Sequence, residues 1–259
     1  MTAQERKFLE MLGVQMSAES ISDPLTKTLS EVRNELLAGL SDTDRKAYLH
    51  LVDWIRTTDV ASHALKVGDR PPDFLLPDAH GRLHSSEQLR GEGRLVVSFY
   101  RGGWCPFCNE ELRALQAVKA EFETLKANLV VLSPETGDLP RQLKRQLNLD
   151  LTMLADVDHG VAISYGVLFR VPEETKAHYT GQGYDFARRH GSTQWMLPIP
   201  ATYVIDQDGV VRGAFVEPDF TIRQEPSDIL ATVRQLARPR LTMRPKRAND
   251  VGQKDKLLT

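Results

Sequence analysis

The chain has two cysteines, Cys105 and Cys108, and they lie three residues apart. An apolar run at 95–100 comes directly before them, and a segment with helical character follows. This order predicts a buried strand, a tight turn and a dithiol at the first turn of a helix. Because a helix N-terminus favours an anion, the arrangement favours a thiolate and thiol redox chemistry.

The spacing assigns different roles to the two sulfurs. Residues i and i+3 of a helix face the same way, about 5–6 Å apart, so the sulfurs can form a bond with little backbone movement. Pro106 suits the first helical turn, where its missing N–H costs nothing. Free backbone N–H groups then point toward Cys105, which is predicted to be the exposed nucleophile. Cys108 is predicted to be the resolving thiol, which releases an oxidised or mixed-disulfide adduct as an internal disulfide.

Other interpretations of the cysteine pair are weaker. A zinc site would need two further ligands, and the seven histidines show no paired ligand spacing. An inert core pair conflicts with Gly102, Gly103 and Pro106, which favour an exposed turn. Trp104 is expected either to pack beside that turn or to shape the approach of a substrate. No metal ion and no cofactor is expected, because sulfur itself carries the electrons.

The elements around the dithiol alternate between strand and helix, which predicts an α/β fold with a central sheet flanked by helices. Strands are expected at 74–76, 95–100, 129–132 and 152–154, and helices at 85–90, 106–126, 139–147 and 159–165. A hairpin at 202–205 and 210–216 and a helix at 226–236 follow.

Three divisions of the chain are expected. Residues 1–64 form an N-terminal helical extension, residues 65–240 the main domain and residues 241–259 a flexible tail. Glycine and paired prolines at 68–72 mark the first boundary. The apolar stripes of the extension either pack on the main domain or form a self-association surface. Residues 171–195 interrupt the alternation and are expected to be an inserted loop, as a lid or part of an interface.

The composition restricts the partners. The chain has 259 residues, of which 41% are hydrophobic and 26% charged, with a net charge of -2. This is typical of a soluble globular protein and gives no reason to expect a nucleic acid or a membrane surface. No apolar run approaches the roughly 20 residues that span a bilayer, and the first residues do not resemble a secretory signal. Two cysteines cannot form a framework of several bridges, so a cytoplasmic protein with a reversible dithiol is expected.

Four motifs then carry a family resemblance. They are the segments 66–74 (KVGDRPPDF), 98–112 (SFYRGGWCPFCNEEL), 132–136 (LSPET) and 200–206 (PATYVID). Together they resemble the peroxiredoxin-like branch of the alkyl hydroperoxide reductase and thiol-specific antioxidant superfamily, over about residues 65–238. The resemblance implies a thioredoxin-like fold with a central mixed sheet. It also implies peroxide reduction, with Cys105 as the peroxidatic residue and electrons from thioredoxin or a similar dithiol donor.

The chain also departs from that family. Typical members have Thr or Ser at the position of Gly102 and Pro at the position of Val97. They have an Arg at the position of Pro200. The Thr and Arg normally bind the peroxide. Arg101 lies near enough in sequence to supply a cation in their place, and the alternative is that it is a solvated charge at the strand end. Thioredoxin-like folds place a cis proline before this strand, and Pro200 is predicted for that role, with Pro198 as the weaker candidate.

The favoured function is therefore a thiol-dependent hydroperoxide reductase that cycles Cys105 and Cys108 between dithiol and disulfide. Predicted supporting residues are Arg101, Gly103, Trp104, Pro106, Pro200 and Thr202. The alternatives are a protein disulfide oxidoreductase without significant peroxidase activity and a non-enzymatic redox-sensing protein. Expected partners are a hydroperoxide, a thioredoxin-like electron donor and, through the N-terminal helices, a second copy of the chain.

Overall fold

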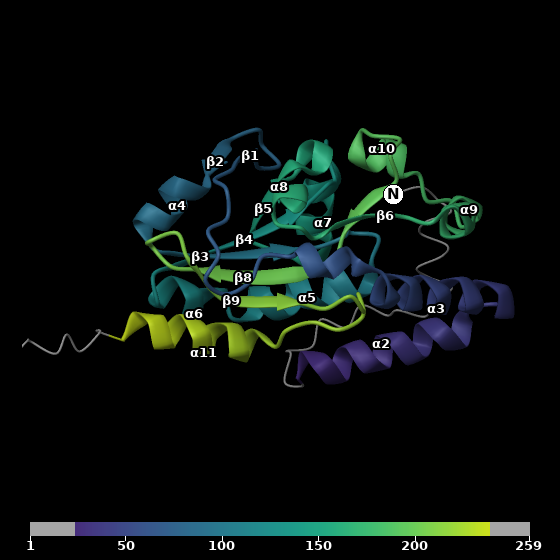
Figure 1. Cartoon of the computed structure of the whole chain (residues 1–259), viewed down its shortest axis with the longest axis horizontal. Coiled ribbons are helices and arrows are strands. Elements are labelled where there is room, and N and C mark those ends of the chain that lie inside the picture. Colours follow the sequence, from purple (N-terminus) through teal and green to yellow (C-terminus); the bar gives the residue numbers. More distant parts are fainter. Residues whose placement is uncertain (1–23, 239–259) are drawn as a thin grey trace, which may run out of the picture.

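A mixed sheet forms the centre of the protein, whose computed structural model describes residues 24–238 (Figure 1). The strand order is β5-β4-β3-β8-β9, with bounds Thr152–Ala155, Ala127–Ser133, Arg94–Phe99, Ala201–Ile205 and Val211–Val216. β3 runs parallel to β4 and antiparallel to β8. The predicted α/β architecture is confirmed. Predictions for the first 23 residues and for the tail at 241–259 lie outside the described residues.

The middle of the sheet is buried because its strands are apolar on both faces. In β3, every residue from Leu95 to Phe99 is buried, and β4 is buried from Leu129 to Ser133. Such continuous apolar runs are typical of strands covered by helices on two sides. Figure 1 shows α6 (Lys119–Thr124) and α11 (Pro226–Ala237) below the sheet and α4 (Ser86–Glu92) above it.

Further elements surround the sheet. The helices α7 (Leu139–Leu147) and α8 (Gly160–Ser164) lie close to their predicted positions. β1 (Leu75–Pro77) overlaps the strand expected at 74–76, and it pairs with β2 (Leu83–Ser85), which was not predicted. A second antiparallel ribbon, of β6 (Leu168–Arg170) and β7 (Met196–Pro198), was not predicted either. No helix between residues 24 and 238 is long and apolar enough to cross a membrane.

The single helix predicted at 106–126 is wrong. The chain forms α5 (Pro106–Ala117) and then α6, and Val118 between them has φ -106° and ψ 7°. Neither proline nor glycine marks this break in the sequence, so a pattern of apolar residues could not reveal it.

The loop predicted at 171–195 is also wrong, because it contains α9 (Glu173–Gly181) and α10 (Phe186–His190). The side chain of Asp185 accepts a hydrogen bond from the backbone N–H of Arg188 at 2.9 Å and so caps α10. Phe186 is completely buried. Aromatic residues that look scattered in the sequence therefore form a packed cluster.

Two N-terminal helices, α2 (Leu25–Gly39) and α3 (Asp42–Thr57), lie along one side of the molecule (Figure 1). Their apolar faces belong to the same hydrophobic core as the sheet, through Leu25, Leu29, Val32, Leu51, Val52 and Ile55. Helix α2 contacts α5, and α3 contacts α9. The two helices thus lie against the segment that carries the cysteines and against the 171–195 insertion.

Candidate active site

Cys105 occupies the N-cap position of α5, directly after the loop that follows β3. Pro106 occupies the first turn of the helix, as predicted. Both cysteines are unlinked thiols, and Cys105 is 1% exposed and Cys108 0% exposed. The predicted exposure of Cys105 is wrong, because side chains from distant segments cover the helix start.

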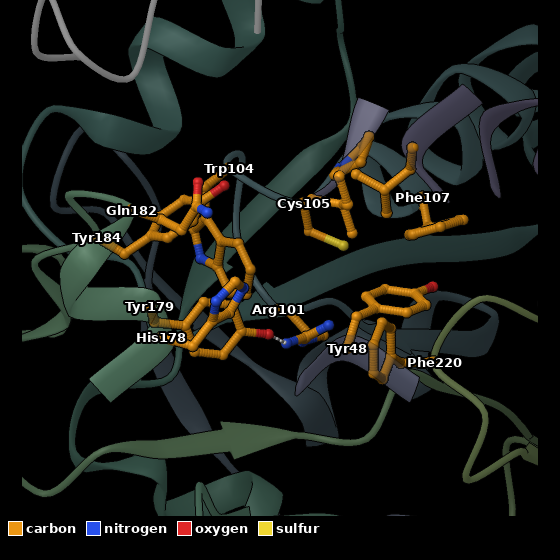
Figure 2. A pocket seen from close by; sticks show the side chains of 13 residues that line it. Tyr48, Arg101, Trp104, Cys105, Phe107, His178, Tyr179, Gln182, Tyr184 and Phe220 are labelled. Carbon is orange, nitrogen blue, oxygen red and sulfur yellow. Dashed lines mark hydrogen bonds between the residues drawn. The ribbon is translucent and has the colours of Figure 1, made fainter. Parts of the chain in front are cut away.

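A pocket leads to this covered sulfur. Its empty volume is about 510 Å³, including the open mouth. Figure 2 shows the Cys105 sulfur pointing into the space bordered by Arg101 and Tyr48. The walls come from the N-terminal helices, the cysteine loop, the insertion and the segment after β9, as Leu36, Leu40, Tyr48, Arg101, Trp104, Cys105, Pro106, Phe107, His178, Tyr179, Gln182, Tyr184 and Phe220. Most of these side chains are apolar or aromatic.

Arg101 places a cation in this aromatic environment. It is 1% exposed, so the interpretation as a solvated charge at the strand end is wrong. Its Nη2 donates a hydrogen bond to the Tyr179 hydroxyl at 2.6 Å. The guanidinium lies 4.7 Å from the ring centre of Trp104 and 4.1 Å from that of Phe220. Cation–π contacts and one hydrogen bond therefore hold a charge that acts on Cys105.

The environment of Cys105 favours its thiolate. Burial alone would raise the pKa of this thiol, since a charge is costly in a low-dielectric interior. A hydrogen bond from the Cys108 thiol and the charges of Arg101 and Arg223 outweigh that cost and lower the pKa to about 6. Cys105 is therefore mostly ionised at neutral pH.

Cys108 has the opposite character. Burial raises the pKa of its thiol well above the usual value, and the hydrogen bond and negative charge of Cys105 raise it further. Only the charge of Arg223 and the backbone N–H of Arg101 oppose this change. At neutral pH, Cys108 is thus a neutral thiol that donates to the Cys105 sulfur.

A buried ion pair beside Cys108 was not predicted from the sequence. Arg223 Nε donates to Glu111 Oε2 at 2.6 Å, and Arg223 Nη2 lies 3.3 Å from the Cys108 sulfur. Both charged side chains are at least 95% buried. Glu111 belongs to the motif at 98–112, but Arg223 lies far along the chain, outside every motif that was recognised, so only the fold reveals their contact.

Two glycines shape the loop before Cys105. The N–H of Gly103 donates to Glu135 Oε2 at 2.8 Å, which ties the loop to the LSPET segment. Gly102 has φ +143°, and a Cβ there would lie 2.5 Å from Trp104 Nε1. Glycine is therefore required at 102 both for the backbone angle and for the close approach of the indole.

Trp104 packs beside the turn, which is one of the two roles expected of it. It is 7% exposed and packs against Tyr179, Tyr184 and Phe186, with ring centres 5.0–5.6 Å apart. It also lines the pocket. Its packing partners come from the insertion, so this segment supports the wall of the site.

Pro200 and Thr202 lie elsewhere. No peptide bond between described residues is cis, so the prediction of a cis proline at Pro200 or Pro198 is wrong. The N–H of Ile199 donates to Val167 O at 2.6 Å, and this bond holds the short connection between β7 and β8 against the residue before β6. Neither Pro200 nor Thr202 lines the pocket. Thr202 instead donates to Ser98 Oγ across the sheet at 3.4 Å.

Metal ligands are not grouped in this part of the protein. Between residues 24 and 238, no set of three or more His, Cys, Asp or Glu side chains is arranged to hold a metal ion.

The family model described as "AhpC/TSA family" matches residues 67–214. The chain belongs to the AhpC/TSA family. It is 30% identical to Peroxiredoxin Bcp of Escherichia coli K12 over 154 residues, which cover 58% of this chain and 85% of the relative. It is 27% identical to a putative peroxiredoxin bcp of Coxiella burnetii over 150 residues, covering 57% and 86%. The predicted family is thus confirmed, and the relatives support a thiol-dependent peroxidase.

The solved structures agree in fold. The crystal structure of peroxidoxin BcpB from Mycobacterium tuberculosis matches with a TM-score of 0.53 and 23% sequence identity. The match covers 66% of this chain and 98% of the BcpB chain. The predicted thioredoxin-like fold is confirmed. Helices α2 and α3 and the residues Phe220 and Arg223 lie outside the family match, although all of them contribute to the site.

Proposed function

We propose that the protein reduces a hydroperoxide at Cys105 and resolves the oxidised sulfur with Cys108. The Cys105 thiolate attacks the terminal peroxide oxygen, so an S–O bond forms, the O–O bond breaks and the alcohol leaves after taking a proton from water. Cys108 then displaces the oxygen of the sulfenic acid as water and forms the disulfide. A dithiol donor of the thioredoxin type restores both thiols.

One observation carries this proposal: the more acidic thiol of the pair is the one that faces the pocket. The pKa of Cys105 is lowered to about 6, and Cys105 lines the cavity, whereas Cys108 lies behind it and stays protonated. A thiolate nucleophile with an adjacent thiol is the arrangement that a two-cysteine peroxidase requires.

Arg101 is the residue best placed to replace the peroxide-binding groups that the chain lacks. It is buried, it lines the pocket and its charge acts on Cys105. A guanidinium at this position can donate hydrogen bonds to the peroxide oxygens and stabilise charge on the leaving oxygen. Gly103, Trp104 and Pro106 support it by shaping the loop and the pocket wall.

Stopped-flow mixing of the reduced protein with a peroxide tests the proposal. Trp104 packs beside the site, so oxidation should change tryptophan fluorescence in two phases, first for sulfenic acid and then for the disulfide. Cys105→Ser should abolish both phases, and Cys108→Ser should retain the first and lose the second. Oxidation no faster than that of a free thiol would refute the peroxidase assignment.

A protein disulfide substrate fits the site less well. In the dithiol form, the Cys105 sulfur is covered by side chains from four segments, so attack on a protein disulfide would require these side chains to move, whereas a small peroxide does not require this. An insulin reduction assay under the same conditions is expected to show little activity.

Self-association through the N-terminal helices stays a proposal. The buried apolar residues of α2 and α3 pack against this chain's own core. Within these two helices, Leu49 is the one large hydrophobic side chain that is exposed. Light scattering of the reduced and the oxidised protein would measure whether the oligomeric state depends on the dithiol.

A further inference from the structure

We infer that Arg223, held in place by Glu111, stabilises Cys108 as a thiolate during the steps in which this sulfur makes or leaves the disulfide. The inference rests on the proposed dithiol cycle, and it gives a role to a buried ion pair outside the pocket. Arg223 is thereby the group that makes an otherwise unreactive, fully buried thiol competent for resolution.

The geometry directs one nitrogen of Arg223 at the sulfur. Nε is occupied by Glu111 Oε2 at 2.6 Å. Nη1 donates to the backbone carbonyls of Phe220 and Ile222, the latter at 2.9 Å. Nη2 then lies 3.3 Å from the Cys108 sulfur. Three of its contacts therefore fix the guanidinium plane, and the fourth meets the thiol.

Glu111 is anchored in turn by the sheet. Ser98 Oγ donates to Glu111 Oε1 at 3.2 Å, and Thr202 Oγ1 donates to Ser98 Oγ at 3.4 Å. These hydroxyls come from β3 and β8, the paired strands at the middle of the sheet. Glu111 is consequently a positioning residue, and Thr202 has an indirect place in the site.

A second donor reaches the same sulfur. The backbone N–H of Arg101 lies 3.4 Å from Cys108 Sγ. Two donors, one of them charged, thus converge on a side chain that is 0% exposed. Since burial penalises a thiolate, a resolving cysteine at this depth needs such compensation before it can act as a nucleophile.

The oxidation state of Cys105 controls when this compensation takes effect. In the reduced site, the Cys105 thiolate accepts the Cys108 hydrogen bond and its charge opposes ionisation of Cys108. Conversion of Cys105 to sulfenic acid removes that charge, and Arg223 then acts on Cys108 alone. Cys108 loses its proton, its sulfur forms the S–S bond and the S–O bond of the sulfenic acid breaks, with release of water.

Reduction reverses the electron flow at the same sulfur. A donor thiolate attacks Cys105, the S–S bond breaks and Cys108 leaves with the bonding electron pair. Thiolates of lower pKa leave faster, so the hydrogen bond from Arg223 accelerates this step as well.

Titration of Cys108 in a Cys105→Ser background tests the inference without any peroxide. Thiolate absorbance near 240 nm should give an ionisation constant at least tenfold lower when Arg223→Gln is added. Arg223→Lys keeps the charge and should give a smaller decrease. Because Arg223→Gln leaves Glu111 without its partner, the pair Arg223→Gln and Glu111→Gln serves as a second variant, with a decrease in the same direction.

The matched control is Arg94→Gln. Arg94 is also largely buried and paired with a carboxylate, Asp206, but it lies at the opposite end of β3. It should leave the titration of Cys108 unchanged. If the Arg223 variants also leave that titration unchanged, the inference is wrong.

Stopped-flow kinetics with both cysteines present separates this result from the proposed function. At pH 8, Cys105 is ionised in each protein, so Arg223→Lys should slow the second fluorescence phase by severalfold more than the first. Equal slowing of both phases would contradict the role in resolution. Absence of the first phase in the parent protein would instead overturn the peroxidase assignment, and the titration of Cys108 would keep its meaning.

Discussion

Cys105 and Cys108 differ in acidity because each modifies the other. The Cys105 thiolate accepts a hydrogen bond from Cys108, and this contact lowers the pKa of one thiol while it raises that of the other. Two positive charges, on Arg101 and Arg223, decide that the site carries one negative charge at neutral pH. The chemistry of the site therefore depends on buried cations as much as on the start of α5.

The reactivity of Cys105 should follow its thiolate. With a pKa of about 6, the rate of oxidation by peroxide should be constant above about pH 7 and fall by about tenfold per pH unit well below pH 6. A pH series of the first stopped-flow phase measures this. A profile that rises only near pH 8.5, as for an ordinary thiol, would contradict the low pKa.

The same shift has a consequence for stability. An unfolded thiol has a pKa of about 8.5, so the depressed pKa of Cys105 stabilises the fold above that pH and the contribution is lost as the pH falls through 6. Relative to Cys105→Ser, the free energy of unfolding of the reduced protein should therefore decrease between about pH 8.5 and pH 6. Denaturant titration at several pH values checks the sign.

Gly102 offers a test of the loop geometry. Gly102→Ala should destabilise the protein by about 2–4 kcal/mol, because the new Cβ would meet the Trp104 indole and the positive φ is strained. Gly137→Ala is the control, since Gly137 has φ +64° but open space at its Cβ, and its cost should be about 1 kcal/mol. Equal losses of unfolding free energy for the two variants in urea titrations would show that contact with the Trp104 indole does not destabilise Gly102→Ala.

The sequence predicted those site residues that lie in the cysteine motif. Cys105, Cys108, Arg101 and Trp104 meet in one place, and the family resemblance identified the loop. It did not find Arg223, because an ion pair between segments 112 residues apart leaves no local pattern. It also misjudged the exposure of Cys105, since the covering side chains come from helices whose packing a periodic stripe does not specify.

Among the elements, the insertion with α9 and α10 is the least expected part of the site. It supplies Tyr179, which holds Arg101, and Phe186, which packs against Trp104. A contact of 2.9 Å between His178 Nδ1 and Asp44 Oδ1 joins α9 to α3. The insertion therefore connects the N-terminal helices with the cysteine loop.

Removal of the Tyr179 hydroxyl tests that connection. Tyr179→Phe keeps the aromatic packing but leaves Arg101 without its 2.6 Å hydrogen bond. The free energy of unfolding should fall by about 1 kcal/mol, and the rate of peroxide reaction should fall severalfold as the guanidinium loses its orientation. A variant with the parent rate would indicate that cation–π contacts alone orient Arg101.

Buried strands were the most predictable elements. Continuous apolar runs identified β3 and β4, and the Asp-Gly turn identified the β8–β9 hairpin. The insertion was unpredictable because α10 is only five residues long and α9 carries a weak apolar stripe, so neither has the periodic pattern on which helix prediction depends.

On the scale of the whole molecule, the carboxylate of Glu225, directly before α11, binds the N-terminus of α2. Glu225 accepts hydrogen bonds from the N–H groups of Leu25 at 3.0 Å and Thr26 at 2.7 Å. It thereby caps α2 across a separation of 200 residues. Since α2 lines the pocket through Leu36, this cap helps to hold a wall of that pocket.

Glu225→Ala should destabilise the protein by about 1–2 kcal/mol, as expected for the loss of a helix cap. Glu123→Ala removes an exposed carboxylate paired with Lys119 and should cost no more than about 0.5 kcal/mol. Hydrogen exchange would locate the effect, because protection should fall first in α2. Equal protection of α2 in both variants would mean that core packing alone secures the helix.

The covered position of Cys105 makes unequal demands on its two reactants. A small peroxide can diffuse through the gap between the aromatic walls, whereas a mixed disulfide brings two sulfur atoms to about 2 Å from each other. A protein donor cannot bring its cysteine this close to the Cys105 sulfur unless the side chains of Tyr48 and its neighbours move away. Turnover with such a donor would then alternate between a closed form that reacts with peroxide and an open form in which the disulfide is reduced. At saturating peroxide, the opening would limit the turnover rate.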